Sequence, residues 1–194
     1  MVPAHGNEDG KGILMGNVGV WDVWYAGSGR EEPRPYGDVH TYGIGADWLA
    51  GCGLVADWGC GFGWLRTLIE PDRYIGIDGS QTPHADIIAD LTEYREPTPG
   101  VFMRHVIEHN HEWRKVLANA VASAQERMVL ILFTPMADAT CDLPTDHGLD
   151  VPDISFALVD LEPFFDGMTV QMETLATGTQ YGVETVFLME RGVS

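Results

Sequence analysis

Short apolar runs, several of them closed by an aspartate, recur along the first two thirds of the chain. The run at 128–133 is apolar throughout, and those at 74–78 and 86–90 each end in an acid. Runs without polar interruption are typical of strands that lie buried on both faces of a parallel sheet. The pattern predicts strands over 54–58, 74–78, 86–90, 100–104 and 128–133.

Helical periodicity is strongest between the last two of these runs. Apolar residues at helical spacing predict a helix over 111–125. Weaker patterns predict short helices over 41–49 and 62–69. We also expect a short helix that Ser155 caps and that ends near Phe165.

The tail of the chain changes to strict alternation of apolar and polar residues. Alternation over 168–175 and 183–189 predicts an antiparallel hairpin. Strands separated by helical crossovers give an α/β, doubly wound, mostly parallel sheet, to which this hairpin adds antiparallel strands. Because only 11 residues separate Asp78 from Asp90, we expect the second crossover to lack a full helix.

The N-terminal 50 residues differ from the rest. Trp21, Trp24 and Tyr25 lie close together there, and exposed aromatic side chains are costly. Two interpretations stay open, a cap packed on the core and a lid over a ligand. We therefore divide the chain into an aromatic arm or lid at 1–50 and a single domain at 51–194.

Composition narrows the classes of partner and compartment. The formal net charge is −18 with 2 lysines, which argues against binding to nucleic acid phosphates. No apolar run approaches the length of a membrane helix. The 3 cysteines form no C-x-x-C pair, and the first ten residues lack the features of a secretory leader, so we expect an acidic cytoplasmic protein.

The segment that holds the most specific signal is Asp57-Trp58-Gly59-Cys60-Gly61-Phe62-Gly63. It joins a predicted strand to a predicted helix, and such a turn forms a niche for a nucleotide at the carboxyl end of the strand. The glycine spacing is G-x-G-x-G rather than the G-x-G-x-x-G of dinucleotide-binding proteins, which disfavours an NAD-dependent oxidoreductase.

Four segments in order resemble the motifs of the class I S-adenosylmethionine-dependent methyltransferases. The glycine segment is similar to that family's (D/E)-x-G-x-G-x-G, and Tyr74-Ile75-Gly76-Ile77-Asp78-Gly79-Ser80 resembles its second motif. Asp90-Leu91 and His105-Val106-Ile107-Glu108-His109 resemble the third and fourth. The resemblance runs from about residue 50 to the C-terminus and implies a Rossmann-like fold.

The resemblance also implies a cofactor site for S-adenosylmethionine. The glycine turn would lie against the methionyl and ribose portions, and a strand-end acid would accept from the ribose hydroxyls. Asp57 keeps two interpretations, an acid that satisfies turn N–H groups and one that also receives the methionine ammonium. The implied cofactor residues are Asp57, Gly59, Cys60, Gly61, Gly63, Asp78, Gly79, Asp90, Leu91 and Arg104.

The densest polar cluster, 104–111, follows the fourth strand, beside the sulfonium in the family. Its candidate catalytic residues are His105, Glu108 and His109, and three interpretations of them stay open. Glu108 and His109 could buttress the fold. Either histidine could be the general base. The cluster could also bind a divalent metal, because some family members carry E-x-x-E-H where this chain has H-x-x-E-H.

Together these observations predict transfer of a methyl group from S-adenosylmethionine to an O or N acceptor on a small molecule or glycan, with S-adenosylhomocysteine (SAH) as the product. One alternative is a metal-assisted methyltransferase of RNA ends or catechols. The other is a non-catalytic protein that binds S-adenosylmethionine. The N-terminal arm and the long polar loop predicted over 134–152 match no motif, and they would determine the choice of acceptor.

Overall fold

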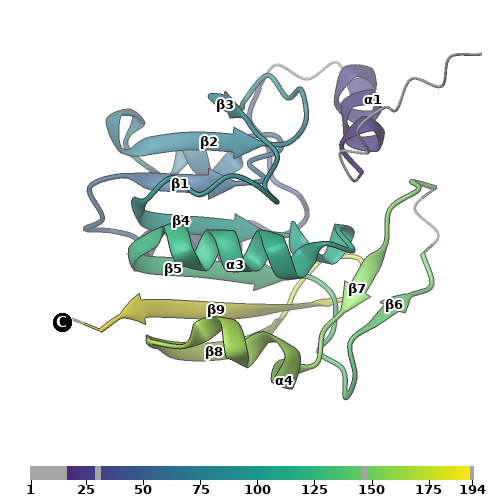
Figure 1. Ribbon diagram of the computed structural model, residues 1–194. Coiled ribbons are helices and arrows are strands. Elements are labelled where there is room, and N and C mark those ends of the chain that lie inside the picture. Colours follow the sequence, from purple (N-terminus) through teal and green to yellow (C-terminus); the bar gives the residue numbers. More distant parts are fainter. Residues whose placement is uncertain (1–16, 29–31, 146–147, 193–194) are drawn as a thin grey trace, which may run out of the picture.

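The computed structural model describes residues 17–28, 32–145 and 148–192 (Figure 1). Its centre is a seven-stranded sheet with the order β3-β2-β1-β4-β5-β9-β8. The first five of these strands are parallel, and β9 runs antiparallel to both β5 and β8. Its strands are β1 (Val55–Trp58), β2 (Tyr74–Asp78), β3 (Ile87–Ile88), β4 (Thr98–Arg104), β5 (Ala124–Leu132), β8 (Met168–Ala176) and β9 (Val183–Arg191). The predicted α/β class and C-terminal antiparallel hairpin are confirmed.

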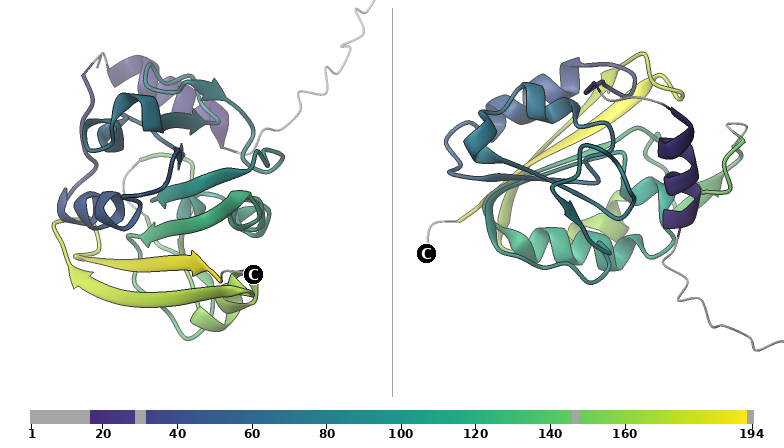
Figure 2. Two further views of the ribbon diagram at one scale, coloured as in Figure 1. Left: turned by 90° about the vertical axis from the view of Figure 1, so that its left-hand side faces the viewer. Right: turned by 90° about the horizontal axis from the view of Figure 1, so that it is seen from above.

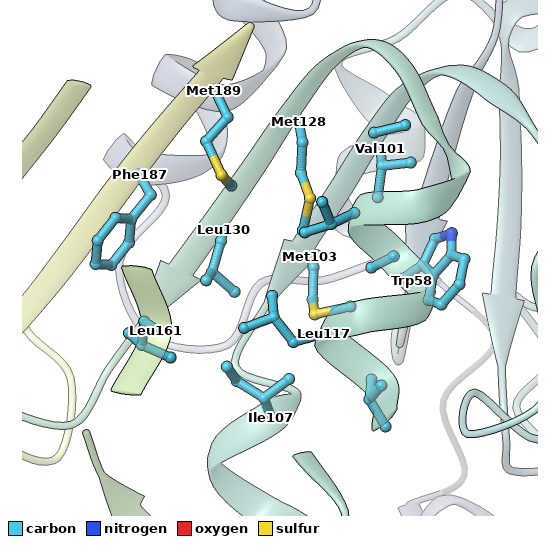
Figure 3. Close-up of a cluster of buried hydrophobic side chains, with 14 of the residues drawn as sticks. Trp58, Val101, Met103, Ile107, Leu117, Met128, Leu130, Leu161, Phe187 and Met189 are labelled. Carbon is cyan, nitrogen blue, oxygen red and sulfur yellow. The ribbon is translucent and has the colours of Figure 1, made fainter. Parts of the chain in front are cut away.

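Helices cover both faces of the sheet (Figure 2). Helix α3 (Trp113–Ser123) packs on one face, where Leu117 contacts the cluster that contains Met103 and Leu130 (Figure 3). Helix α2 (His40–Trp48) packs on the other face. A Cβ atom at Gly45 would lie 2.4 Å from the Phe102 ring, so only glycine lets α2 approach the sheet this closely. Helix α2, which lies within the predicted arm at 1–50, is therefore part of the core.

The helix expected over 62–69 is absent. The chain forms only a 3₁₀ turn, η1 (Trp64–Thr67), and a second one, η2 (Pro71–Arg73). Gly63 enters η1 in the left-handed conformation, and a proline follows within a few residues, so the segment has no room for a second α-helical turn.

No helix lies in the segments that directly precede and follow β3 in the chain. Residues 79–86 and 89–97 contain only turns and bends, so the predicted loss of the second crossover helix is confirmed and extends to the third crossover. The half of the sheet that ends in β3 is therefore less covered by helices than the half around β5.

The connection after β5 is more ordered than expected. Within the predicted loop, β6 (Cys141–Leu143) pairs antiparallel with β7 (Asp153–Ser155). Ser155 donates its hydroxyl to the Pro135 carbonyl and does not cap a helix. Helix α4 (Leu158–Leu161) begins after Ala157 instead and continues as η4 (Glu162–Phe165). Residues 146–147 lie outside the described residues.

Helix α1 (Val18–Ser28) lies beyond the carboxyl ends of the parallel strands (Figures 1 and 2). None of its residues is buried. No helix in the described part of the chain is long and apolar enough to span a membrane. The carboxyl edge of the sheet, α1 and the turn between β8 and β9 together surround the site described next.

Candidate functional site

A cavity of about 380 Å³ opens at the carboxyl ends of β1, β2 and β4. This volume lies in the range of small-molecule sites. Eight of the predicted site residues line the cavity, namely Gly59, Asp78, Gly79, Asp90, Leu91, Arg104, His105 and His109. Residues of all four predicted motifs, which are far apart in the sequence, therefore line one cavity.

The glycine turn begins at the cavity, where Gly59 is part of the lining next to β1. Gly59, Gly61 and Gly63 have φ angles of 71°, 52° and 65°, a region that side chains with a Cβ rarely adopt. A Cβ atom at Gly59 would lie 2.4 Å from the Val106 side chain, so the turn also needs glycine for space. The N–H groups of Gly59 and Cys60 both donate to the Ile77 carbonyl, which fixes the turn against β2.

Asp78, the last residue of β2, organises the turn. Its Oδ2 accepts from the Gly61 N–H at 2.9 Å, and its Oδ1 accepts from the Ser80 N–H at 2.9 Å. Burial raises the pKa of Asp78 to about 6, against the opposing effect of these two hydrogen bonds. Each carboxylate oxygen has a second lone pair, so the side chain can still accept hydrogen bonds from a ligand in the cavity.

Asp90 and Leu91 form the wall beyond β3. The Asp90 Oδ1 accepts from the N–H and the hydroxyl of Thr92, at 2.9 and 2.8 Å. This local turn holds the carboxylate at the cavity, with Leu91 beside it.

Four of the predicted cofactor residues do not line the cavity, namely Asp57, Cys60, Gly61 and Gly63. Asp57 is buried and accepts from the Tyr74 hydroxyl at 2.8 Å. The expectation that it satisfies N–H groups of the turn is wrong, because those of Gly59 and Cys60 donate to Ile77 and that of Gly61 donates to Asp78. Burial raises its pKa to about 7, while the Tyr74 hydrogen bond opposes the rise. Burial also raises the pKa of the Cys60 thiol, which does not favour a nucleophilic role. The cofactor roles of these four residues remain predictions.

Arg104 and His105 meet a residue that the sequence analysis did not single out. Glu184 accepts through Oε1 from the Arg104 Nη2 and from the His105 Nε2, both at 2.6 Å. Its other oxygen accepts from the Thr41 hydroxyl at 3.2 Å. Alternation along β9 places Glu184 on the same strand face as Val186 and Leu188. An acid among the apolar residues of that face is the sequence signal by which Glu184 could have been found.

His105 is held in an uncommon backbone conformation. Its φ is 57°, and no other described residue apart from glycine has a positive φ. Burial lowers the pKa of His105 well below its ordinary value, and the positive charges of Arg104 and His109 act in the same direction. The imidazole is therefore neutral at neutral pH.

His109 has the opposite environment. Its Nδ1 lies 2.9 Å from the Pro152 carbonyl and 3.1 Å from Asp153 Oδ1. Burial would lower the pKa of His109, but the hydrogen bond to Asp153 and the charge of Glu108 raise it above its ordinary value. The Phe133 ring contacts both histidines, with ring centroids 4.8 Å from His105 and 5.2 Å from His109.

Glu108 is buried and does not line the cavity. Its Oε1 accepts from the Phe133 N–H at 2.8 Å, and burial raises its pKa to about 7. His105, Glu108 and His109 thus turn toward three different partners, which supports a structural role for Glu108. Among the described residues, no group of three or more His, Cys, Asp or Glu side chains is arranged to hold a metal ion.

Helix α1 covers the cavity with aromatic side chains. Trp21, Trp24 and Tyr25 line it together with Tyr36. Trp24 stacks on Tyr36 at 5.7 Å, and Trp21 lies 5.2 Å from the His109 ring. Hydrogen bonds tie the helix region to the site, from Asn17 Nδ2 to the His109 carbonyl and from the Gln81 N–H to an Asp22 carboxylate oxygen. The arm thus packs on the domain and covers the cavity at once.

Comparison with known proteins gives a likeness of structure only. No protein-family model and no curated protein matches the sequence. Among solved structures, the magnesium protoporphyrin IX methyltransferase of Synechocystis PCC 6803 with bound SAH superposes with a TM-score of 0.61 at 17% identity, covering 91% of this chain and 96% of that one. The Burkholderia thailandensis 1,6-didemethyltoxoflavin-N1-methyltransferase, with its substrate and SAH bound, gives 0.61 at 13% identity over 80% and 78%.

The same fold also occurs in a protein named for a different reaction. The [4+2]-cyclase SpnF superposes with a TM-score of 0.58 at 11% identity, covering 93% of this chain and 94% of that one. The chain therefore has the fold of the class I S-adenosylmethionine-dependent methyltransferases, as the motifs predicted, and the reaction has to be argued from the site.

Proposed function

We propose that this protein is an S-adenosylmethionine-dependent methyltransferase that acts on an O or N acceptor of a small molecule or glycan. One observation carries the proposal. A single cavity is lined by Gly59, Asp78 and Asp90 at the ends of three neighbouring strands and by His105 and His109 beyond the fourth. Groups suited to a nucleoside thus adjoin groups suited to proton transfer.

The residues present fit the cofactor. The second lone pairs of the Asp78 carboxylate can accept from a vicinal diol, and charged acceptors form the stronger hydrogen bonds. Asp90 can accept from an adenine amino group beside Leu91, and the bare backbone at Gly59 lets a ligand approach. Similar folds that hold SAH, in the Synechocystis and Burkholderia enzymes, support this assignment.

Methyl transfer requires the protein mainly to position the acceptor and to supply a base. S-adenosylmethionine supplies a methyl group on a positively charged sulfur, ready for in-line attack by the acceptor's lone pair. The chain has to orient the acceptor and take its proton. His105 and His109 are the candidates, and the aromatic wall of Trp21, Trp24 and Phe133 excludes water.

The walls and the charge favour a small acceptor over a polyanion. The net charge of −18 repels nucleic acid phosphates. The metal-assisted alternative would need a group of metal ligands, and among the described residues no His, Cys, Asp or Glu side chains form one. An acceptor with an aromatic or other apolar portion would match the cavity wall.

Calorimetry with SAH tests the proposal. We expect wild-type protein to bind SAH and not NAD. Asp78→Asn removes the charge from two cofactor hydrogen bonds, so it should weaken binding at least about tenfold, or roughly 1.4 kcal/mol. Asp72→Asn, at an exposed residue of η2 away from the cavity, is the matched control and should bind as wild type does. Wild-type protein that binds no SAH would overturn the proposal.

A further inference from the structure

Glu184 is a buried acid in the wall behind His105, contributed by a strand that carries none of the predicted site residues. It is the second residue of β9 and is fully buried. Its Oε1 accepts two short hydrogen bonds, from Arg104 Nη2 and His105 Nε2, and its Oε2 accepts from the Thr41 hydroxyl. A β9 residue therefore holds two groups at the end of β4, although β5 lies between these strands in the sheet.

This arrangement sets the tautomer of His105. With Arg104 bonded to it, Glu184 is a carboxylate and can only accept, so the His105 Nε2 must carry the hydrogen. The other ring nitrogen, Nδ1, makes no hydrogen bond to a described residue, and the His105 side chain lines the cavity. Nδ1 is thus left with a free lone pair.

The backbone of His105 supports a functional placement. A positive φ at a residue with a Cβ costs about 1–2 kcal/mol, and such outliers concentrate at functional sites. The surrounding structure maintains the conformation through the hydrogen bond to Glu184, the bond from the His105 N–H to the Ile131 carbonyl, and the contact with Phe133.

Burial is the main cause that keeps the His105 ring neutral, and the positive charges of Arg104 and His109 add to it. Arg104 on β4, Glu184 on β9 and His109 on η3 (Ile107–His109) face it, and Arg104 balances the charge of Glu184. Burial then lowers the pKa of His105, so the ring is unprotonated at neutral pH. His109 differs, because its Nδ1 is engaged by Pro152 and Asp153 and its pKa is raised.

We propose that Glu184 is a positioning residue, which holds His105 as the Nε2–H tautomer so that Nδ1 is the base for the acceptor. The inference rests on the proposed function. As the acceptor's lone pair bonds to the methyl carbon, the carbon–sulfur electron pair returns to sulfur and the acceptor's proton passes to Nδ1. His105 then loses that proton to solvent. Between the two histidines, this assigns the base to His105.

Nitrogen-15 NMR of the histidine rings tests the inference without any acceptor. In wild-type protein we expect His105 to be neutral and in the Nε2–H tautomer from pH 6 to pH 8. In Glu184→Gln the amide can donate as well as accept, so the ratio of the Nε2–H to the Nδ1–H tautomer should fall at least about tenfold. Asp153→Asn is the matched control and should alter the His109 signals while leaving the His105 tautomer unchanged.

The outcomes separate the two proposals. An Nδ1–H or charged His105 in wild-type protein overturns the positioning role, as does an unchanged tautomer ratio in a folded Glu184→Gln variant. If that variant does not fold, as judged by its amide spectrum, the wild-type tautomer decides alone. If the tautomer is as expected but calorimetry detects no SAH binding, the proposed function fails and the positioning of His105 by Glu184 stands.

Discussion

Asp57 offers the sharpest test, because its two interpretations predict different pH dependence. The change is Asp57→Asn, which keeps the shape and can still accept from the Tyr74 hydroxyl. In the folded chain burial raises the pKa of Asp57 to about 7 from an ordinary 3.8, with the Tyr74 hydrogen bond opposing and the charge of Asp78 adding to the rise.

The sign of the change in stability with pH depends on which state, folded or unfolded, binds the Asp57 proton more tightly. The folded state holds a proton on Asp57 up to about pH 7, whereas the unfolded chain loses it near pH 4. The contribution of Asp57 to the stability of the fold is therefore greatest below pH 4 and is lost as the pH rises to 7. A pKa difference of about three corresponds to roughly 4 kcal/mol, of which roughly 2.5 kcal/mol falls between pH 5 and pH 8.

Urea denaturation at pH 5 and pH 8 measures this quantity. The free energy of unfolding of Asp57→Asn minus that of wild type should rise by roughly 2.5 kcal/mol between these values, because the other titrating groups cancel in the difference. Tyr74→Phe removes the opposing hydrogen bond and should steepen the loss of stability with pH. A difference that does not change with pH would refute the reasoning.

SAH titrations then separate the two interpretations of Asp57. If its carboxylate receives the methionine ammonium, binding needs the ionised form. Wild-type affinity should then rise from pH 5 to pH 8 more steeply than that of Asp57→Asn. If Asp57 has no contact with the cofactor, the two proteins should share one pH dependence, set by Asp78, whose pKa is about 6.

Two further predictions concern the glycine turn. Gly59→Ala would place a methyl group 2.4 Å from Val106 at a φ of 71°, so urea denaturation should show a loss of about 2–4 kcal/mol in the free energy of unfolding. Gly53→Ala is the control, because its methyl group meets nothing within 4 Å and should leave the stability nearly unchanged. The hydroxyls of Tyr25 and Tyr36 lie close together beside Gly61 in this turn. Tyr25→Phe and Tyr36→Phe should each weaken the binding of SAH several-fold in calorimetry. Neither should weaken the binding of 5′-methylthioadenosine, which lacks the amino-acid portion. Equal losses for both nucleosides would contradict that placement.

The strands could be predicted because a strand buried on both faces leaves a continuous apolar run. β2 begins and ends where its run does, and β1 and β4 differ by a residue or two at one end. Helices are harder to predict from local pattern. The apolar residues after Gly63 have helical spacing, but the left-handed entry at this residue and Pro71 beyond it leave only a 3₁₀ turn.

The cofactor side of the site follows from local motifs, and the catalytic side depends on distant partners. Asp78 accepts from the Gly61 N–H and Gly59 donates to the Ile77 carbonyl, so both contacts join the first motif to the second and the two motifs together contain the geometry. His105 meets Glu184 across 79 residues, and His109 meets Asp153 across the long loop after β5. Which ring nitrogen stays free, and hence which histidine can be the base, is decided by those pairings.

The loss of helices beside the glycine turn explains why the N-terminal arm is aromatic. Phe62 in the turn is only 2% exposed, yet no α-helix follows β1 to cover it. Trp24 and Tyr36 cover it instead, with ring centroids 5.2 Å from that of Phe62. The same two side chains line the cavity. The arm therefore caps the glycine turn. The surface that buries the turn is also the wall that would enclose a ligand beside it, so the lid interpretation stays a prediction that is compatible with the cap.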